Sequence, residues 1–461
     1  MANLLEAYSK RLAVSESVYA KQHAGAKMDN HKKLTVAKVL ENTNKFLNEA
    51  FSNSMGTQRS DMGEFKKFCL NLTTVALPNL IANDLVLVSP MSSMTGYITY
   101  IQYSTGTDKG ETTADTVIND PFRLGKVDAN YTSSCVVEPH SATGVFTPTF
   151  DAIVKDVFMD EDGNKFDLKV TKTAADGTVT RTFAKATDSI AVGEGETVKV
   201  AYMYDNVIVP QEKPLPTIKA EMKSMALLAK ARRIAVYYSQ IAAFQAKTDY
   251  GFDLGDQLAE KAVGQLSYEI DTEIVNLLDE TAGEGATKVY ADDKESTLTL
   301  TWKRDIPGGV SKAEHYEGFS EVIEVGRQIV YDRTKRFAPN YMIIASDILP
   351  ILTFMKGFSA APAGQINGPY FAGTLNGLKV YVSPAIKRGR FLLGVNGDDM
   401  MSSVAVYAPY MAIVPTQLLQ YADGGTSQGW STMYDLKVLN KDLIVAGKVD
   451  GEAFGAHYFE K

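Results

Sequence analysis

A sustained apolar stripe along residues 254–280 is the feature that most limits how this chain can fold. The stripe consists of apolar side chains three or four residues apart, at Leu258, Ala262, Leu266, Ile270, Ile274 and Leu277. Acidic side chains and glutamines occupy the other positions, so the spacing predicts one amphipathic helix. About 26 residues at 1.5 Å each give a helix roughly 39 Å long, long enough to run the length of a domain.

The stretches before this helix show both helical and strand periodicities. Residues 1–50 carry an apolar helical face, and residues 51–65 are polar and rich in Gly and Ser, as in a linker. Residues 75–103 end in YITYIQY, which alternates as a strand does. Residues 104–135 are rich in Gly, Thr and Asp and predict a long projecting loop. Strand-like runs between turn signals predict a small separate β module over about residues 143–208.

The rest of the chain also mixes the two patterns. Apolar side chains over residues 219–238 recur at helical spacing and predict a helix ahead of the long one. Residues 316–415 predict a helix, several strands and a short helix for which Asp347 is the expected N-cap. The stretch after residue 430 predicts closing strands. The chain is therefore expected to fold in the α+β class.

Composition excludes several classes of protein. The 461 residues are 45% hydrophobic and 22% charged, which allows a large core and argues against disorder. Cys69 and Cys135 are too few for a disulfide framework. No apolar run reaches the roughly 18 residues of a membrane span, and an acid near the start argues against a signal peptide. From the lack of both we expect a soluble protein made in the cytoplasm. A net charge of -8 argues separately against general nucleic-acid binding.

Residue patterns typical of metal and nucleotide sites are incomplete. The glycine pairs in GEGET and GEGAT lack the further residues of a dinucleotide or phosphate loop. Histidines do not recur at the i, i+4 spacing of a helical metal site. They stand at His23, His31, His140, His315 and His457. We expect no metal or cofactor site.

Two further patterns resemble functional loops without completing them. Residues 425–429 match G-x-S-x-G around Ser427, but a strand-like run follows where a hydrolase needs a helix, so we expect a plain loop. Asp160, Asp162 and Asn164 begin like a calcium loop that lacks its final glutamate. A hairpin turn explains them better, and no catalytic residue is predicted.

Three blocks of sequence resemble one protein family. ALPNLIANDLVLVSPMSSMTGYITYIQY is similar to the stretch that opens the shell-forming part of the major capsid proteins of T4-like tailed bacteriophages. The run from ARRIAVYYSQ to SYEIDTEIV resembles the family's paired helices, which a loop around Gly251 would join. YMIIASDILPIL, FAGTLNGLKVYV and VYAPYMAIVP follow in family order.

The resemblance implies the capsid fold named after phage HK97. That fold has an N-terminal arm, an extended loop, a peripheral domain with a long spine helix, and an axial domain. The implied ranges are 1–75 for the arm, 76–103 for the start of the peripheral domain, 104–208 for the extended loop with its β insertion at 143–208, 209–315 for the peripheral domain with the spine helix at 254–280, 316–420 for the axial domain, and 421–461 for C-terminal peripheral strands.

The resemblance also implies a processing site. The family's prohead protease cuts after glutamate in a Leu-x-Glu context, and residues 46–50, Phe-Leu-Asn-Glu-Ala, match this pattern. Residues 4–6, Leu-Leu-Glu, match it too. We expect cleavage between Glu49 and Ala50, with residues 1–49 as a propeptide.

A shell protein needs extended surfaces that one chain cannot satisfy alone. Edge strands and arms can pair with neighbouring subunits, through contacts that are weak singly and cooperative together. A basic pair on an expected helix suits contacts between subunits better than a ligand. The expected contact residues are Arg232, Arg233, Tyr97, Tyr100, Asp108 and Lys109.

The function that the resemblance implies is self-assembly into the icosahedral head shell of a tailed phage. The expected partners are copies of the chain as hexamers, vertex and portal proteins, scaffold and prohead protease during assembly, and decoration proteins. The shell would enclose double-stranded DNA without binding it specifically, and no membrane is involved. The alternatives are a pentameric vertex paralogue, an encapsulin-like compartment shell, and, in another class, a β-rich binding or hydrolytic protein.

Overall fold

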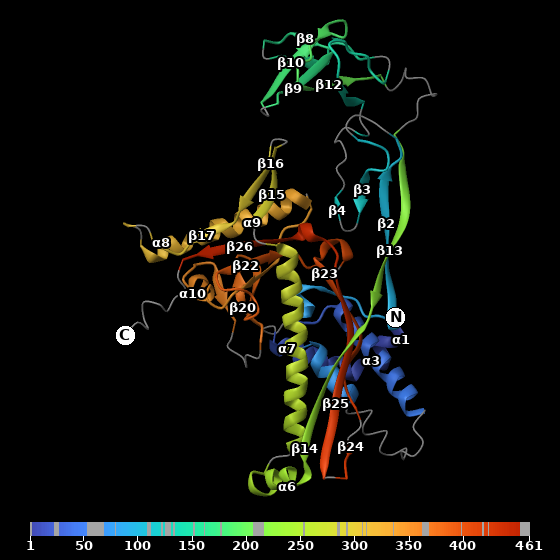
Figure 1. Ribbon diagram of the computed structural model, residues 1–461, viewed down its shortest axis with the longest axis vertical. Helices are drawn as coiled ribbons and strands as arrows, with labels where there is room; N and C mark the ends of the chain where they lie inside the picture. Colours follow the sequence, from blue (N-terminus) through green and yellow to red (C-terminus); the bar gives the residue numbers. More distant parts are fainter. Residues whose placement is uncertain are drawn as a thin grey trace. The chain divides into compact units, whose positions relative to one another are not determined.

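The computed structural model separates into two compact units, Met1–Ile98 with Met225–Lys461, and Thr99–Ser224 (Figure 1). Each unit is described by itself. The structure describes residues 2–22, 27–52, 69–78, 80–107, 112–120, 123–124, 131, 134–150, 153–160, 162–175, 178–205, 216–251, 254–283, 286–291, 294–306, 308–309, 311–334, 336–361, 368–397, 399–416, 419–422 and 424–451.

The first unit begins with helices, as the sequence predicts. They are α1 (Ala2–Ala7), α2 (Ser9–Gln22) and α3 (Asn30–Ser52), and residues 69–78 are helical as well. Leu12, Tyr19 and Leu40 are buried in the main core of this unit, together with side chains of the C-terminal half. The N-terminal helices are therefore an integral part of the folded unit.

A seven-stranded sheet holds the main core of the first unit. In spatial order its strands are β17 (Thr301–Lys303), β26 (Ile444–Asp450), β22 (Arg390–Gly394), β18 (Tyr341–Ile344), β21 (Leu378–Val382), β20 (Tyr370–Leu375) and β19 (Phe358–Ala360). Every residue of β18 is buried, so both faces of this central strand are covered. The rings of Phe319 and Phe391 meet edge to face at 5.3 Å and join α9 to β22. Nearby helical segments are α8 (Lys312–Glu317), α9 (Phe319–Thr334), α10 (Leu349–Leu352) and the short 3-10 turns Met400–Ser402 and Lys441–Leu443.

A second, five-stranded sheet carries the predicted long helix. Its order is β1 (Leu87–Val88), β23 (Ala405–Pro415), β25 (Gly425–Val438) and β14 (Lys230–Ser239), with β24 (Leu419–Gln420) also on β25. The helix α7 (Leu254–Ala282) confirms the prediction from the apolar stripe. Ala262 and Leu266 of α7 pack with Trp430 and Ile413 of the sheet. Figure 1 shows α7 running alongside β14 and β25. The short α5 (Ala82–Leu85) precedes β1, α6 (Gln240–Asp249) follows β14, and the hairpin β15 (Ala286–Ala291) and β16 (Lys294–Thr299) follows α7.

The helix predicted over residues 219–238 is wrong. The structure forms β13 (Ile218–Leu228) and β14 there, and β14 pairs antiparallel with β25 from Lys230 opposite Tyr434 to Ser239 opposite Gly425. Half-buried and exposed residues alternate along β14, as in a strand with one covered face. Pairing with β25 and packing against α7 decided the structure, so tertiary contacts overrode an ambiguous local pattern.

Other local predictions also need correction. Asp347 does not cap α10, because Ile348 is the N-cap residue and no side chain bonds there. The Asp347 carboxylate instead accepts a hydrogen bond from the Gly389 amide at 3.0 Å and lies 3.4 Å from Arg304. Ser427 lies inside strand β25, where a loop was expected. The C-terminal strands divide between the sheets, β25 in the five-stranded one and β26 in the seven-stranded one.

The second unit contains a β module with a core of its own, and its sheet begins at Cys135 rather than near residue 143 as predicted. Its four-stranded sheet has the order β10 (Val179–Ala184), β9 (Leu168–Thr173), β12 (Thr197–Met203) and β5 (Cys135–His140). Leu168, Val200 and Tyr202 are fully buried in a separate hydrophobic cluster. Short pairs complete the module: β6 (Gly144–Val145) with β11 (Ser189–Ile190), and β7 (Phe158–Met159) with β8 (Lys165–Phe166).

The hairpin predicted around Asp160 is confirmed. The strands β7 and β8 pair on either side of it, and the Asp160 carboxylate accepts hydrogen bonds from the backbone and side-chain nitrogens of Asn164 at 2.7 and 2.9 Å. These hydrogen bonds lower the pKa of Asp160, although partial desolvation opposes them. Asp160 therefore stabilises the turn between β7 and β8.

The region predicted as a projecting loop contains paired strands. A second four-stranded sheet has the order β13, β2 (Thr95–Thr105), β3 (Val117–Asp120) and β4 (Arg123–Leu124). The predicted strand YITYIQY lies in β2, and this prediction is confirmed.

Candidate assembly surfaces

The residues singled out from sequence motifs do not assemble into the sites that those motifs would require. No group of three or more His, Cys, Asp or Glu side chains within the described residues is placed to hold a metal ion. Ser427 pairs with Tyr237 and Leu419 across strands, so it does not occupy the tight strand-to-helix turn of a hydrolase nucleophile. Among the described residues, no helix is long and apolar enough to span a membrane.

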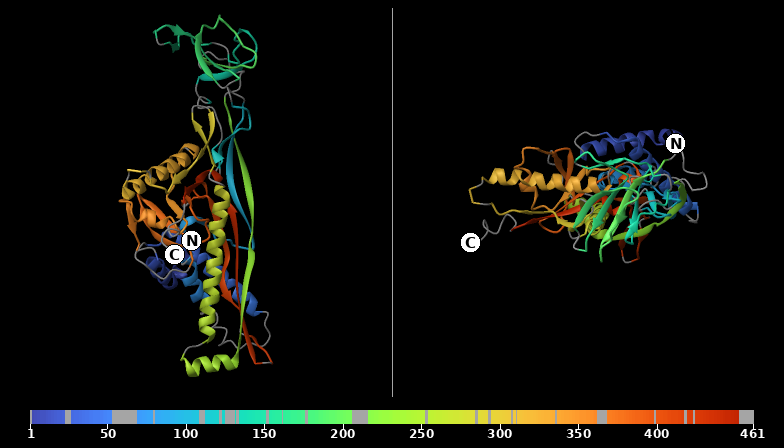
Figure 2. Two further views of the ribbon diagram at one scale, coloured as in Figure 1. Left: turned by 60° about the vertical axis from the view of Figure 1, so that its left-hand side comes forward. Right: turned by 90° about the horizontal axis from the view of Figure 1, so that it is seen from above.

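One end of the first unit exposes a group of large apolar side chains. Ile241, Phe244 and Tyr250, on α6 and its C-cap, are 74%, 71% and 77% exposed. Tyr237 at the end of β14 and the residues Leu419 and Tyr421 are also exposed. We call these six residues the α6 tip. Figure 2 shows α6 beyond the lower end of α7, next to the ends of the long strands.

Strand pairing and a helix cap build the α6 tip. Tyr237 and Leu419 both lie opposite Ser427, so the register places them on one face of the sheet. The rings of Tyr237 and Tyr421 lie 6.2 Å apart. The Ser239 hydroxyl accepts a hydrogen bond from the Ala242 amide and starts α6 directly after β14. Large apolar groups gathered in this way on a surface mark a site of association.

The strand β2 exposes a second set of apolar side chains. Tyr97 is 71% exposed, Ile101 and Tyr103 are exposed, and Tyr100 is half-buried. Two further residues expected to make contacts, Asp108 and Lys109, lie outside the described residues. The aromatic positions predicted on this strand are therefore available to a partner.

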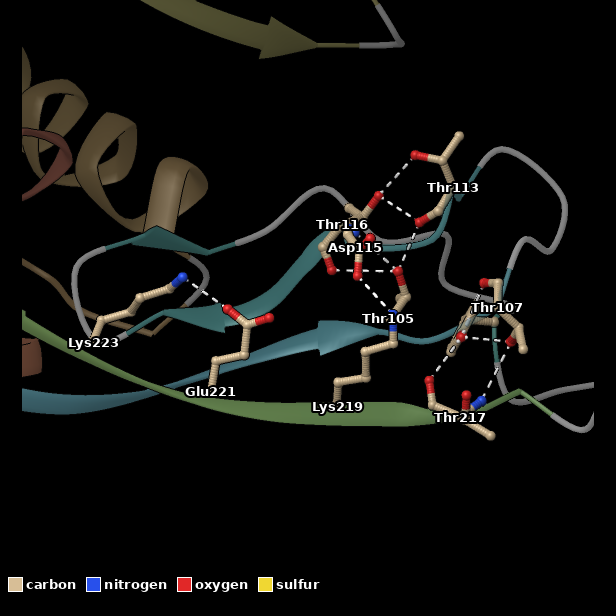
Figure 3. A network of polar contacts seen from close by, with 10 residues as sticks. Thr105, Thr107, Thr113, Asp115, Thr116, Thr217, Lys219, Glu221 and Lys223 are labelled. Carbon is tan, nitrogen blue, oxygen red and sulfur yellow. Dashed lines mark hydrogen bonds and ion pairs between the residues drawn. The ribbon is translucent and has the colours of Figure 1, made fainter.

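A polar network ties the end of β2 to the neighbouring segments (Figure 3). The Thr105 hydroxyl donates to the Thr113 carbonyl at 2.7 Å and accepts from the Thr116 amide at 3.0 Å. Lys219 of β13 forms an ion pair with Asp115 at 2.8 Å. The Thr105 bonds are local, whereas the Lys219–Asp115 pair joins segments 104 residues apart in the region where a loop was expected.

The basic pair at Arg232 and Arg233 lies on strand β14 rather than on a helix. The Arg232 guanidinium lies 2.6 Å from Glu273 and 3.5 Å from Glu269, both on α7. The Tyr434 hydroxyl also donates to Glu273. Arg233 is exposed. Arg232 therefore joins the strand to the long helix within one chain, and a role between subunits stays a prediction for both arginines.

Replacing Arg232 with alanine is expected to lower the free energy of unfolding of the subunit by about 1 kcal/mol, because a half-exposed ion pair and its ring contact are lost. Arg233→Ala, next to it and exposed, should change that free energy by less than about 0.5 kcal/mol. Chemical denaturation of the unassembled chain measures both. Equal effects of the two substitutions would contradict the in-chain role of Arg232.

Two buried carboxylates stand out that the sequence analysis did not identify. Asp271 on α7 accepts a hydrogen bond from the Ile81 amide at 3.1 Å, and burial raises its pKa to about 8. The Asp84 side chain is fully buried and meets the Tyr19 hydroxyl and the Lys32 ammonium at 3.2 and 3.1 Å. Asp271 stands four residues before Val275 and seven before Leu278, both fully buried, and this helical spacing is the signal of its burial. Asp84 has no such signal.

The peptide bond expected to be cleaved lies in α3, which extends to Ser52. Glu49 and Ala50 are near the C-terminal end of that helix, and the side chains of both are outside the described part of the chain. Helix ends fray more readily than helix centres. The structure thus places the site close to a helix end, and cleavage stays a prediction.

Comparison with known proteins gives a sequence match over most of the chain. The model of the family Gp23, described as major capsid protein Gp23, matches residues 62–455. The major capsid protein of Enterobacteria phage T6 is 23% identical, over 79% of this chain and 76% of that protein. The major capsid protein of Vibrio phage KVP40 is 25% identical, over 79% of this chain and 74% of that protein.

Solved structures show a weaker similarity. A structure from Mycobacterium phage Bobi has a TM-score of 0.37 and 10% identity, covering 80% of this chain and 90% of that one. The capsid of Myoviridae phage XM1 has a TM-score of 0.34 and 9% identity, covering 68% and 94%. The sequence match is the stronger of the two similarities.

Proposed function

Since the chain belongs to the Gp23 family of major capsid proteins of tailed bacteriophages, we propose that its copies join into the head shell mainly through the α6 tip and strand β2. Its elements fit the HK97-like capsid fold: N-terminal helices, the extended strands β2 and β13, and the long helix α7. A shell of identical subunits needs surfaces that stay unsatisfied in one copy. The observation that carries the proposal is the exposure of the α6 tip.

Burial of the α6 tip against other copies supplies a favourable contact at each repeat. Transfer of apolar surface out of water contributes roughly 25 cal/mol per Å². Each aromatic side chain of the tip can bury on the order of 150 Å² or more. Because a subunit in a shell makes such a contact with several neighbours, modest single contacts add to a stable assembly.

The proposal extends to the steps around assembly. Subunits assemble as hexamers with vertex and portal proteins present, scaffold and prohead protease act during assembly, and decoration proteins bind afterwards. The protease removes residues 1–49 after Glu49. The shell encloses double-stranded DNA without specific contacts, consistent with a net charge of -8. The chain acts as a structural protein of the virion rather than as an enzyme.

Electron microscopy of particles from infected cells, combined with the intact mass of their subunits, tests this proposal. We expect closed shells in which this chain is the most abundant protein and its mass begins at Ala50. A mass that begins at Met1 would contradict processing. A low copy number confined to the vertices would contradict the hexameric role.

A further inference from the structure

The N-terminal helices are fixed to the rest of the first unit at one buried carboxylate. The Asp84 side chain, on α5, has no exposed surface. Two groups from the N-terminal helices reach it: the Tyr19 hydroxyl of α2 at 3.2 Å and the Lys32 ammonium of α3 at 3.1 Å. Burial, together with the charge on Asp84, raises the pKa of Tyr19. A buried charge with these partners resists any change that removes them.

Arg11 of the same helices donates to the neutral Asn71 side chain at 3.1 Å, and further hydrogen bonds join neutral groups. The Asn42 side-chain amide donates to the Met91 and Tyr410 carbonyls at 2.6 and 3.1 Å. The Ser15 hydroxyl donates to the Thr74 carbonyl at 2.9 Å. Among the described residues of these helices, Lys32 is the cation that pairs with Asp84.

The site also contains a cation that does not belong to the N-terminal helices. Lys379, on β21, lies 3.6 Å from Asp84 and is half-exposed. A cavity of about 240 Å³ adjoins the carboxylate, lined by Lys32, Lys379 and the amide side chains of Asn340 and Asn396. If Lys32 leaves, the cavity gives Lys379 and water room to approach, so Asp84 keeps a compensating charge.

We propose that Lys32 and Asp84 form an ionic clasp that holds residues 2–49 on the folded unit, and that Lys379 replaces Lys32 when those residues leave. The holding step follows from the contacts alone, whereas the release step rests on the proposed processing. The clasp adds a removable ion pair to the apolar contacts that the N-terminal helices make in the main core. A permanently buried pair without a substitute cation would instead block their release.

The experiment separates retention from processing. A recognition sequence for a site-specific protease is placed between Ser52 and Cys69 of the full-length chain, which is then cut and passed over a size-exclusion column. The fraction of the N-terminal fragment that stays with the remainder, measured over a range of concentrations, gives the dissociation constant. Lys32→Gln is expected to raise that constant at least tenfold, and Tyr19→Phe about threefold.

Lys33→Gln is the matched control. Lys33 stands next to Lys32 but pairs with Glu16 at 3.1 Å, within the N-terminal helices. The Lys33→Gln substitution should leave the dissociation constant of the N-terminal fragment unchanged. After release, Lys379→Gln should lower the melting temperature of the remaining fragment more than it lowers that of the uncut chain.

Equal retention of the fragment by the wild type and Lys32→Gln would overturn the clasp. Equal effects of Lys379→Gln before and after release would overturn the replacement step. Neither outcome depends on where the phage protease cuts, so the mass measurement in native particles can fail independently. Should Lys32→Gln lower the yield of folded chain, Tyr19→Phe, which removes one hydroxyl, still decides the point.

Discussion

Replacing both Ile241 and Phe244 with aspartate is expected to abolish shell assembly while the subunit stays folded. Both side chains are more than 70% exposed in the single chain, so their loss removes little of its core. In a shell, the two carboxylates would be buried against another copy without a partner, which costs several kcal/mol at each contact. Because the contact recurs throughout the shell, the penalty multiplies.

Sedimentation velocity and negative-stain microscopy measure this loss, and circular dichroism checks the fold. The control adds the same charge to the same helix through Gln240→Asp and Gln245→Asp, which keeps both apolar side chains. Charges at the rim of a contact mainly affect association rate, so this control should still form shells. Shells of normal size and yield from the Ile241 and Phe244 variant would show that the α6 tip is not a contact.

Replacing Asp271 with asparagine is expected to remove a strong pH dependence of subunit stability. The pKa of Asp271 is raised to about 8 by burial in the folded chain, against about 4 in an unfolded chain. The stabilising contribution of the protonated acid is therefore complete below about pH 4 and is lost as the pH rises towards 8. Across that window the free energy of unfolding falls by up to about 1.4 kcal/mol per pH unit.

Chemical denaturation at pH 5 and pH 8 measures the effect. The asparagine oxygen can still accept the hydrogen bond from the Ile81 amide. Between pH 5 and pH 8, the free energy of unfolding of Asp271→Asn should therefore rise relative to that of the wild type by up to about 4 kcal/mol. Val275→Ala is the control, because it creates a cavity on the same buried face of α7 without changing a titratable group. It should lower the free energy of unfolding equally at both pH values. If the wild type and Asp271→Asn differ in free energy of unfolding by the same amount at pH 5 and pH 8, Asp271 does not hold a proton at pH 5.

The elements that periodicity predicts best are those whose burial follows one regular stripe. The helix α7 is the clearest case, since four of the six apolar positions of its pattern are buried and the other two, Leu258 and Leu277, are half-buried. Strand β14 is the opposite case, because a helix was predicted there. Its residues are compatible with helical and with strand spacing, and only pairing with β25 decides between the two structures. Local spacing cannot show which distant strand is available.

The assembly surfaces could be predicted only in part. Exposure of Tyr97 and Tyr103 could be predicted because an even spacing along a strand places them on one face of β2, whereas Tyr100 falls on the other face. The α6 tip was not, because exposure of Ile241 and Phe244 depends on where a helix ends and what lies beside it, which spacing does not encode. Asp84 was missed for the same reason: its partners Tyr19 and Lys32 are more than 50 residues away in sequence.

A cryo-electron microscopy map of the assembled head shell shows directly whether the α6 tip joins subunits. We expect Ile241 and Phe244 to be buried against other copies of the chain at every hexamer, with Tyr97 and Ile101 of β2 also covered. A map in which the α6 tip faces solvent on all subunits, while the shell is held through other surfaces, would contradict this expectation.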